Sequence, residues 1–310
     1  THNYKYQGSL LDPNVRMMGV IKANAYGSLI EVIANKLIAL GIEALAVAYV
    51  SEGVALRKAG IKVPILVFYP QISNFEKIIK YKLEPAIYSK RSWLEFKKII
   101  GKNRNSNYPI HIKYNTGLNR IGFNPNEINW VTAELKHSPI RLKSIYSHLG
   151  ATEAKRPDQK TDLQIKIFQE IINKHKKNTT EKIDFHLLNT SGVFNYPDFR
   201  LDWVRTGIGL YGFANQTDWN EKLKPIASLK TTITQVHKIS KGSTVGYNCG
   251  WTAPYDTKIA VIPIGHADGI ARHYGHSRGW VLINGKKAPM VGNICMDMTM
   301  VEIGKIECEE

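Results

Sequence analysis

Eight short apolar runs, separated by segments of helical length, dominate the first two thirds of the chain. The runs lie at residues 17–23, 44–50, 64–69, 84–89, 109–115, 142–150, 184–189 and 201–207. Continuous apolar runs, rather than alternating ones, indicate strands that are covered on both faces, as in parallel sheets. Amphipathic segments lie between them, for example at 30–40, 75–81, 93–100 and 160–176. Eight such units in about 200 residues favour a (β/α)8 barrel of the TIM type over an open, doubly wound sheet.

The pattern changes after residue 212. Residues 228–238, 258–263, 279–283 and 288–294 alternate polar and apolar side chains between glycine-containing turns. This alternation predicts a mostly antiparallel β domain. We therefore expect an α/β chain with a barrel over residues 1–215 and a β domain over residues 223–310, joined through the polar stretch 213–223.

Charge and cysteine content narrow the possible partners. The 310 residues include 42 Lys and Arg against 26 Asp and Glu, a net charge of +16. A net positive charge of this size is compatible with binding to a nucleic acid, to an acidic surface or to anionic small molecules. No nucleic-acid-binding module is recognisable, no apolar run is long enough for a membrane span, and the start does not resemble a signal peptide. The odd number of cysteines (Cys249, Cys295 and Cys308) favours reduced thiols. We expect a cytoplasmic protein without nucleic-acid, membrane or metal partners.

Unusual polar residues lie at the predicted carboxyl ends of the barrel strands, where barrel enzymes build their sites. They are Lys22, Lys113, His148, Asn189, Thr190 and Arg205. Considered alone, a lysine at the end of a strand usually extends into solvent. A lone histidine is more often an interior residue with its hydrogen bonds formed than a functional one. Their coincidence on one rim predicts a functional site. Residues 189–192 and 206–208 offer hydroxyls and backbone N–H groups for a phosphate, although 189–192 also fits a simple helix N-cap.

These positions fall within a longer series of segments that resembles the alanine racemase family in order and spacing. The segments are VIKANAYG (20–27), HIKYNTGLNRIGF (111–123), SHLGATE (147–153), LNTSG (188–192), DWVRTGIGLYG (202–212), VGYNCGWTA (245–253), IPIGHADG (262–269) and VGNICMDMTMV (291–301). The resemblance implies a pyridoxal-phosphate-dependent isomerase that interconverts L- and D-alanine and supplies D-alanine for peptidoglycan. It also implies a homodimer whose active sites are shared between subunits.

The resemblance assigns two catalytic bases. Lys22 would bind pyridoxal phosphate covalently and act as the base for the D enantiomer. Tyr247, which the family contributes from the partner subunit, would act on the L enantiomer. Lys22 must be neutral to accept a proton, so burial or neighbouring cations such as Arg120 must lower its pKa well below about 10.4. Arg205 would face the pyridine nitrogen without giving up its proton.

The resemblance implies further contacts as well. The remaining cofactor-binding residues would be Tyr26, His148, Asn189, Thr190, Gly207 and Ile208. Arg120 and the backbone of Met296 would bind the substrate carboxylate, and Lys113 matches a lysine that is often carbamylated.

Three departures from the family pattern leave alternatives open. His266 stands where the family usually has a tyrosine, and Asn115 replaces a common aspartate. Both ends are short against the family, so we expect the sequence to be part of a longer protein. The change at His266 allows a broader-specificity or serine racemase as the alternative activity. A noncatalytic pyridoxal-phosphate-binding protein is a second alternative, but that class resembles the barrel only, whereas here the resemblance continues through residues 245–301.

Overall fold

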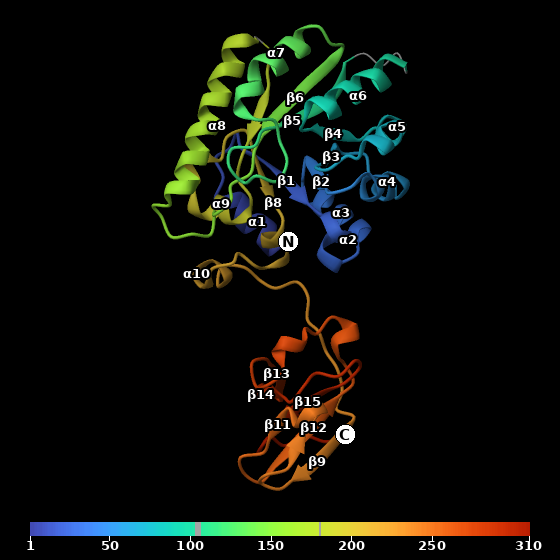
Figure 1. Cartoon of the computed structure of the whole chain (residues 1–310), viewed down its shortest axis with the longest axis vertical. Coiled ribbons are helices and arrows are strands. Elements are labelled where there is room, and N and C mark those ends of the chain that lie inside the picture. The colour runs from blue at the N-terminus through green and yellow to red at the C-terminus, as the bar shows by residue number, and fades with distance from the viewer. Residues whose placement is uncertain (103–106, 180) are drawn as a thin grey trace. The chain divides into compact units, whose positions relative to one another are not determined.

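The computed structural model describes residues 1–102, 107–179 and 181–310, and the chain divides into two compact units, Thr1–Ala227 and Ser228–Glu310. Among the described residues of the first unit, eight parallel strands pair in chain order and close into a barrel (Figure 1). They are β1 (Arg16–Val20), β2 (Ala44–Val47), β3 (Ile65–Val67), β4 (Glu84–Ile87), β5 (Tyr108–Lys113), β6 (Ile140–Tyr146), β7 (Asp184–His186) and β8 (Trp203–Thr206). The barrel predicted from the eight apolar runs is confirmed.

Helices surround the barrel strands (Figure 1). They are α1 (His2–Ser9), α3 (Ile30–Ala39), α4 (Val50–Lys58), α5 (Phe75–Lys80), α6 (Lys90–Lys102), α7 (Ile128–Lys136), α8 (Gln159–Asn178), α9 (Thr190–Asn195) and α10 (Thr217–Asn220). Each longer helix buries an apolar stripe; α8 does so with Ile165, Phe168 and Ile172. Its N-terminus is capped by Asp158, which accepts a hydrogen bond from the Thr161 N–H at 2.8 Å. No helix in the described ranges combines the length and apolar content needed to cross a membrane.

The barrel interior has an apolar part and a polar part. Small or apolar side chains from β1 to β3, such as Met18, Ala46 and Leu66, form a cluster separate from the larger core beneath the helices. From β4 onward the buried residues include many polar groups: Glu84, His111, Lys113, Ser144, His186 and Arg205. Alternate residues of a strand share a face. The residue two positions from an inward-facing polar residue therefore also faces the barrel interior.

The barrel is least regular where β7 meets β8. Within the described residues these strands share one paired position, His186 with Trp203, whereas β5 and β6 share six. Side chains reinforce this seam, since the Trp203 indole N–H donates to the Asp184 carboxylate at 2.9 Å. The Arg205 N–H also donates to the Leu188 carbonyl at 3.0 Å, beyond the paired position.

The segment that follows β1, labelled α2 (Lys22–Gly27), is not a right-handed helix. Ala23, Asn24, Ala25 and Tyr26 have φ values of 53°, 50°, 53° and 55°. A left-handed turn of L-residues costs roughly 1–2 kcal/mol per residue, so tertiary contacts must hold it. The Glu52 carboxylate supplies one by accepting the Ala23 N–H at 2.5 Å. Lys22 therefore lies just beyond the first strand, not at its end as the sequence suggested.

The second unit is an antiparallel β structure, as predicted. Its main sheet has the order β13-β14-β15-β12-β9 (Figure 1). A second, two-stranded sheet pairs β10 with β11. The strands are β9 (Gln235–Ile239), β10 (Thr244–Val245), β11 (Trp251–Thr252), β12 (Thr257–Ile262), β13 (Trp280–Ile283), β14 (Lys286–Val291) and β15 (Thr299–Glu302). The strand predicted from residue 228 begins only at Gln235. Residues 228–234 are mostly exposed and enter no strand ladder of the described structure, so alternating composition alone does not make them a strand.

Candidate active site

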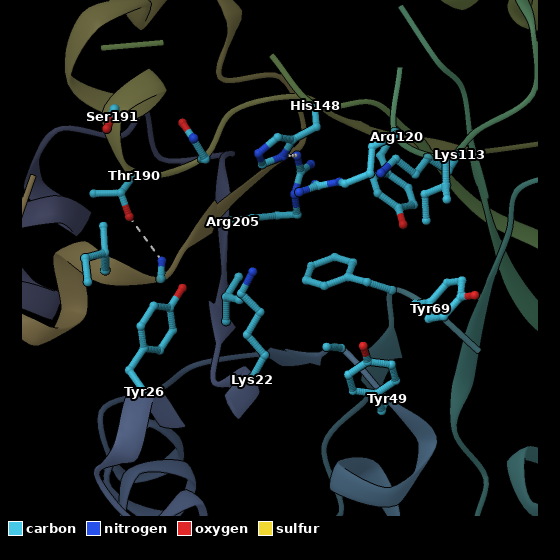
Figure 2. A pocket seen from close by; sticks show the side chains of 18 of the residues that line it. Lys22, Tyr26, Tyr49, Tyr69, Lys113, Arg120, His148, Thr190, Ser191 and Arg205 are labelled. Carbon is cyan, nitrogen blue, oxygen red and sulfur yellow. Dashed lines mark hydrogen bonds between the residues drawn. The ribbon is translucent and has the colours of Figure 1, made fainter. Parts of the chain in front are cut away.

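A pocket of about 550 Å³ lies at the carboxyl ends of the barrel strands. Its volume falls in the range typical of small-molecule and cofactor sites, roughly 300–1,000 Å³. Its lining includes every site residue predicted within the first unit: Lys22, Tyr26, Lys113, Arg120, His148, Asn189, Thr190, Arg205, Gly207 and Ile208. Lys22 and Tyr26 enter the pocket from one side, and Arg205 and His148 lie across from them (Figure 2).

One end of the pocket is built from small residues and hydroxyl groups. The Thr190 hydroxyl accepts hydrogen bonds from the Gly207 N–H at 3.1 Å and the Gly209 N–H at 3.2 Å, which joins α9 to the loop after β8 (Figure 2). A methyl group on Gly207 would collide with the Tyr26 hydroxyl, so the glycine allows that hydroxyl to lie against the backbone. The N-cap interpretation of 189–192 also holds, because the Asn189 side chain accepts the Gly192 N–H at 2.9 Å.

Two lysines in the pocket are less basic than usual. Burial lowers the pKa of Lys22, the positive charge of Arg120 lowers it further, and Glu52 opposes the shift. Burial also lowers the pKa of Lys113 to about 7, with contributions from Arg120, Arg205 and Lys22. A neutral lysine is a nucleophile and a base. The same property would allow Lys113 to react with carbon dioxide, so its carbamylation stays a prediction that its environment supports.

Arg205 lines the pocket and is 3% exposed. Its guanidinium donates to the carbonyl oxygens of Ser147 at 2.7 Å and Leu187 at 2.8 Å, and to His186 Nδ1 at 2.7 Å. These acceptors offset the cost of burying the charge. Burial lowers the pKa of Arg205 to about 10, which leaves it cationic at neutral pH. His148 Nδ1 lies 3.2 Å from the same guanidinium.

Sequence reasoning missed several aromatic residues of the pocket. Tyr49, Phe68, Tyr69 and Tyr146 line it in addition to the predicted residues. The Tyr146 ring stacks on His186 with centroids 4.8 Å apart. Strand parity could have found Tyr146, because it precedes His148 by two residues. Tyr49 and Tyr69 follow β2 and β3, whose apolar runs carried no polar signal.

The site residues predicted in the second unit lie on its surface. Tyr247 is 69% exposed and Met296 is 64% exposed. The segments that contain His266 and Met296 are joined by backbone hydrogen bonds, since the His266 N–H donates to the Cys295 carbonyl at 3.0 Å. The Tyr247 carbonyl accepts a hydrogen bond from the Asn293 side chain at 2.8 Å. The three predicted blocks of this unit therefore come together.

The first unit presents groups that fit pyridoxal phosphate. Lys22 is a primary amine of lowered pKa that can form a covalent link to an aldehyde. The hydroxyls of Tyr26 and Thr190, beside Gly207, can receive a phosphate. Arg205 supplies a buried cation at a pocket wall. A barrel with this donor set, followed by an antiparallel β unit, defines a class of pyridoxal-phosphate enzymes.

Comparison with known proteins identifies the family. Residues 1–215 match the model of the alanine racemase N-terminal domain, and residues 226–310 match that of the C-terminal domain. The alanine racemase of Desulforamulus reducens is 36% identical over 98% of this chain and 83% of its own length. The structure of alanine racemase from Clostridium difficile 630 has a TM-score of 0.87 at 30% identity and covers 99% of this chain and 81% of that one. That of alanine racemase from Bartonella henselae, with covalently bound pyridoxal phosphate, also gives 0.87, at 25% identity over 99% and 84%.

The chain belongs to the alanine racemase family. The family, the isomerase class and the cofactor predicted from the sequence are thereby confirmed. The roles of individual residues remain predictions.

Gly207 provides the first test of the cofactor site. Gly207→Ala places a methyl group against the Tyr26 hydroxyl, so we expect about tenfold weaker binding of pyridoxal phosphate. Titrating the apoprotein with the cofactor and following absorbance measures this change. Gly101→Ala is the matched control, because its added methyl group meets no described atom within 4 Å beyond its chain neighbours and the backbone of its own helix. Equal affinities for the two variants would contradict the placement of Gly207 in the cofactor site.

Proposed function

We propose that this protein interconverts L-alanine and D-alanine with pyridoxal phosphate and so supplies D-alanine for peptidoglycan. The observation that carries the proposal is the Lys22 amine of lowered pKa, located in one pocket with the Thr190–Gly207 pair and the buried Arg205. The site residues predicted from the family resemblance take the roles described below.

The cofactor-holding residues divide by function. Lys22 would bind pyridoxal phosphate covalently, while Tyr26, Thr190, Gly207 and Ile208 would hold its phosphate. Arg205, His148 and Asn189 would contact the ring. When bound, the cofactor withdraws electrons from the substrate amine and makes the Cα proton easier to remove. Arg205 can donate a hydrogen bond to the ring nitrogen and keep its own proton, since a guanidinium remains charged at neutral pH.

Two bases on opposite faces of the substrate would invert its configuration. Once the substrate amine has replaced it in the link to the cofactor, the free and neutral Lys22 amine would take the Cα proton of D-alanine. The phenolate oxygen of Tyr247 would take that of L-alanine. In each direction the other residue returns a proton to the opposite face. Arg120 and the Met296 N–H would hold the substrate carboxylate, with Lys113 orienting Arg120 once it is carbamylated.

The assembly and location of the enzyme belong to the same proposal. We expect a homodimer in which Tyr247 and Met296 enter the active site from the partner subunit, as the family resemblance implies. Their exposure on the second unit supports this, because a residue that serves another subunit must be accessible. A cytoplasmic location is supported by the three cysteines, which are free in the described structure.

Substrate preference tests the proposed activity directly. We expect kcat/KM for alanine to exceed the values for serine and lysine, measured by the change in circular dichroism of each enantiomer. A higher value for serine would favour the alternative racemase that His266 suggests, and His266→Tyr should then shift the preference back toward alanine. Tight cofactor binding without turnover of any amino acid would favour the noncatalytic alternative.

A further inference from the structure

A line of hydrogen bonds crosses the barrel interior and ends at Arg205. Glu84 Oε2 lies 2.9 Å from His111 Nε2, and His111 Nδ1 lies 2.6 Å from the Ser144 hydroxyl. That hydroxyl lies 2.8 Å from His186 Nε2, and His186 Nδ1 lies 2.7 Å from Arg205 Nη1. We call these five residues the barrel relay.

The barrel relay is enclosed by the protein. Its five members come from the five successive strands β4 to β8, and each is at most 9% exposed. It starts at the first residue of β4 and reaches the third residue of β8, so it climbs from the amino end of the barrel toward the pocket. None of its first four residues was predicted as a site residue.

The two ends of the barrel relay set the direction of every hydrogen bond. A guanidinium can only donate, and an ionised carboxylate can only accept. With both histidines neutral, His186 accepts at Nδ1 and donates from Nε2 to Ser144. Ser144 then donates to His111 Nδ1, and His111 donates from Nε2 to Glu84. Burial, followed by the charge of Arg205, lowers the pKa of His186 well below its usual value, which favours this neutral form.

Lys143 keeps the far end of the barrel relay anionic. Its ammonium lies 2.7 and 2.8 Å from the two oxygens of Glu84. Lys143 can reach inward because the register of β5 and β6 shifts there and leaves it without a partner across the ladder. Burial resists ionisation of Glu84, but His111 and Lys143 together outweigh it and lower its pKa to about 2.

Other titratable groups face the two ends of the relay. Arg57 and Tyr108 lie near Glu84. Around Arg205 lie Lys22, Lys113, Arg120, Tyr146 and His148.

We propose that the barrel relay is a positioning device for Arg205, in which Glu84, His111 and Ser144 act through His186 to orient the guanidinium toward the cofactor ring. The inference rests on the proposed function, because the orientation of Arg205 matters only if its guanidinium meets pyridoxal phosphate. The relay occupies one Nη1 hydrogen of Arg205, and the Ser147 and Leu187 carbonyls occupy Nη2. The Nε hydrogen and the second Nη1 hydrogen are not used by these contacts and can serve a ligand. Hydrogen bonds that all point the same way and end on a carboxylate polarise one another, so each bond in the relay is stronger than it would be alone.

Ser144→Ala tests the barrel relay by cutting it at the middle. The His186 Nε2–H then loses its acceptor, so the proton can move to Nδ1, where it would oppose the Arg205 donor. We expect the dissociation constant for pyridoxal phosphate to rise about tenfold. We also expect kcat for alanine racemisation to fall about tenfold while KM changes less than kcat, because the substrate contacts proposed above are made by residues outside the relay. Ser144→Thr restores the hydroxyl and should recover both values.

A matched control separates positioning from stability. Ser92→Ala removes another buried serine hydroxyl, 1% exposed, which binds the backbone near Ser89 on the outer helix layer. It should lower stability without changing the cofactor dissociation constant. If Ser144→Ala does not fold, the same two measurements on Glu84→Gln test the relay. This variant keeps an acceptor oxygen for His111 but removes the negative charge at the end of the relay.

The outcomes distinguish this inference from the proposed function. If the relay variants match Ser92→Ala in both cofactor affinity and kcat, the inference is wrong, whereas racemisation by the wild-type enzyme leaves the proposed function standing. If the wild-type enzyme binds pyridoxal phosphate but does not racemise alanine, the proposed function fails, and the cofactor affinities still decide for or against the relay.

Discussion

Lys22→Ala is expected to abolish alanine racemisation, with a fall in kcat of at least about 10,000-fold. The variant loses both the amine that joins the cofactor and the base for D-alanine. The absorbance band of the covalently bound cofactor should disappear at the same time. Absorbance spectroscopy of the purified protein and the rate of D-alanine formation measure the two effects.

Two further lysine variants sharpen the result. Lys22→Arg places a permanent positive charge in the pocket and cannot release its proton, so it should be as inactive as Lys22→Ala while holding the free cofactor more tightly. Lys36→Ala removes an exposed lysine of α3 and should leave both the spectrum and the rate unchanged. A Lys22→Ala protein that retained the band and the turnover would place the covalent link on another residue.

Tyr247→Phe is expected to slow racemisation by about 100- to 10,000-fold, because it removes the proposed base for L-alanine. Both directions must slow equally in kcat/KM, since enantiomers have the same free energy in water. The measurement that isolates Tyr247 is exchange of the Cα proton in D2O. Lys22 remains present, so D-alanine should still exchange without inversion, whereas exchange into L-alanine should fall together with racemisation.

Tyr255→Phe provides the control for this experiment. Tyr255 is 55% exposed on the same unit, and its hydroxyl lies only 3.5 Å from Glu302, so its loss should not alter turnover. Equal proton exchange into both enantiomers by the Tyr247→Phe enzyme would argue against two separate bases.

The barrel could be predicted because its strands are buried on both faces. Such strands require continuous apolar runs, and the helices between them need amphipathic spacers, so both signals are local. Helix α1 had no such signal. Its buried residues are Asn3 and Gln7, and the Asn3 side chain donates to the carbonyls of Leu210 and Lys224. Hydrogen bonds to residues more than 200 positions away cannot be seen in the sequence of eight residues.

The site residues likewise divide into those marked by a local sequence signal and those that depend on contacts between distant segments. Lys22, Lys113 and Arg205 were found because charged residues in apolar strands are unusual. The left-handed turn at Ala23–Tyr26 was not found, because alanine and tyrosine do not favour positive φ and the turn depends on Glu52 in another segment. His111, Ser144 and His186 were read as ordinary strand residues. His111 lies two residues before Lys113, so it shares a face of the strand with that predicted site residue, and this parity could have marked it.

The seam between β7 and β8 links cofactor loading to the mechanical integrity of the barrel. Asn189 and Thr190 follow β7, and Arg205 and Gly207 belong to β8 and its loop. A ligand held by both groups would bridge the two neighbouring barrel strands that share the fewest paired positions in the described structure. Any ligand that binds only the closed form adds its binding free energy to that closure. Without cofactor, β7 and β8 should therefore separate locally more often than other strand pairs, and amide hydrogens of β8 should exchange faster than those of β5. Cofactor binding should slow the exchange of the β8 amides.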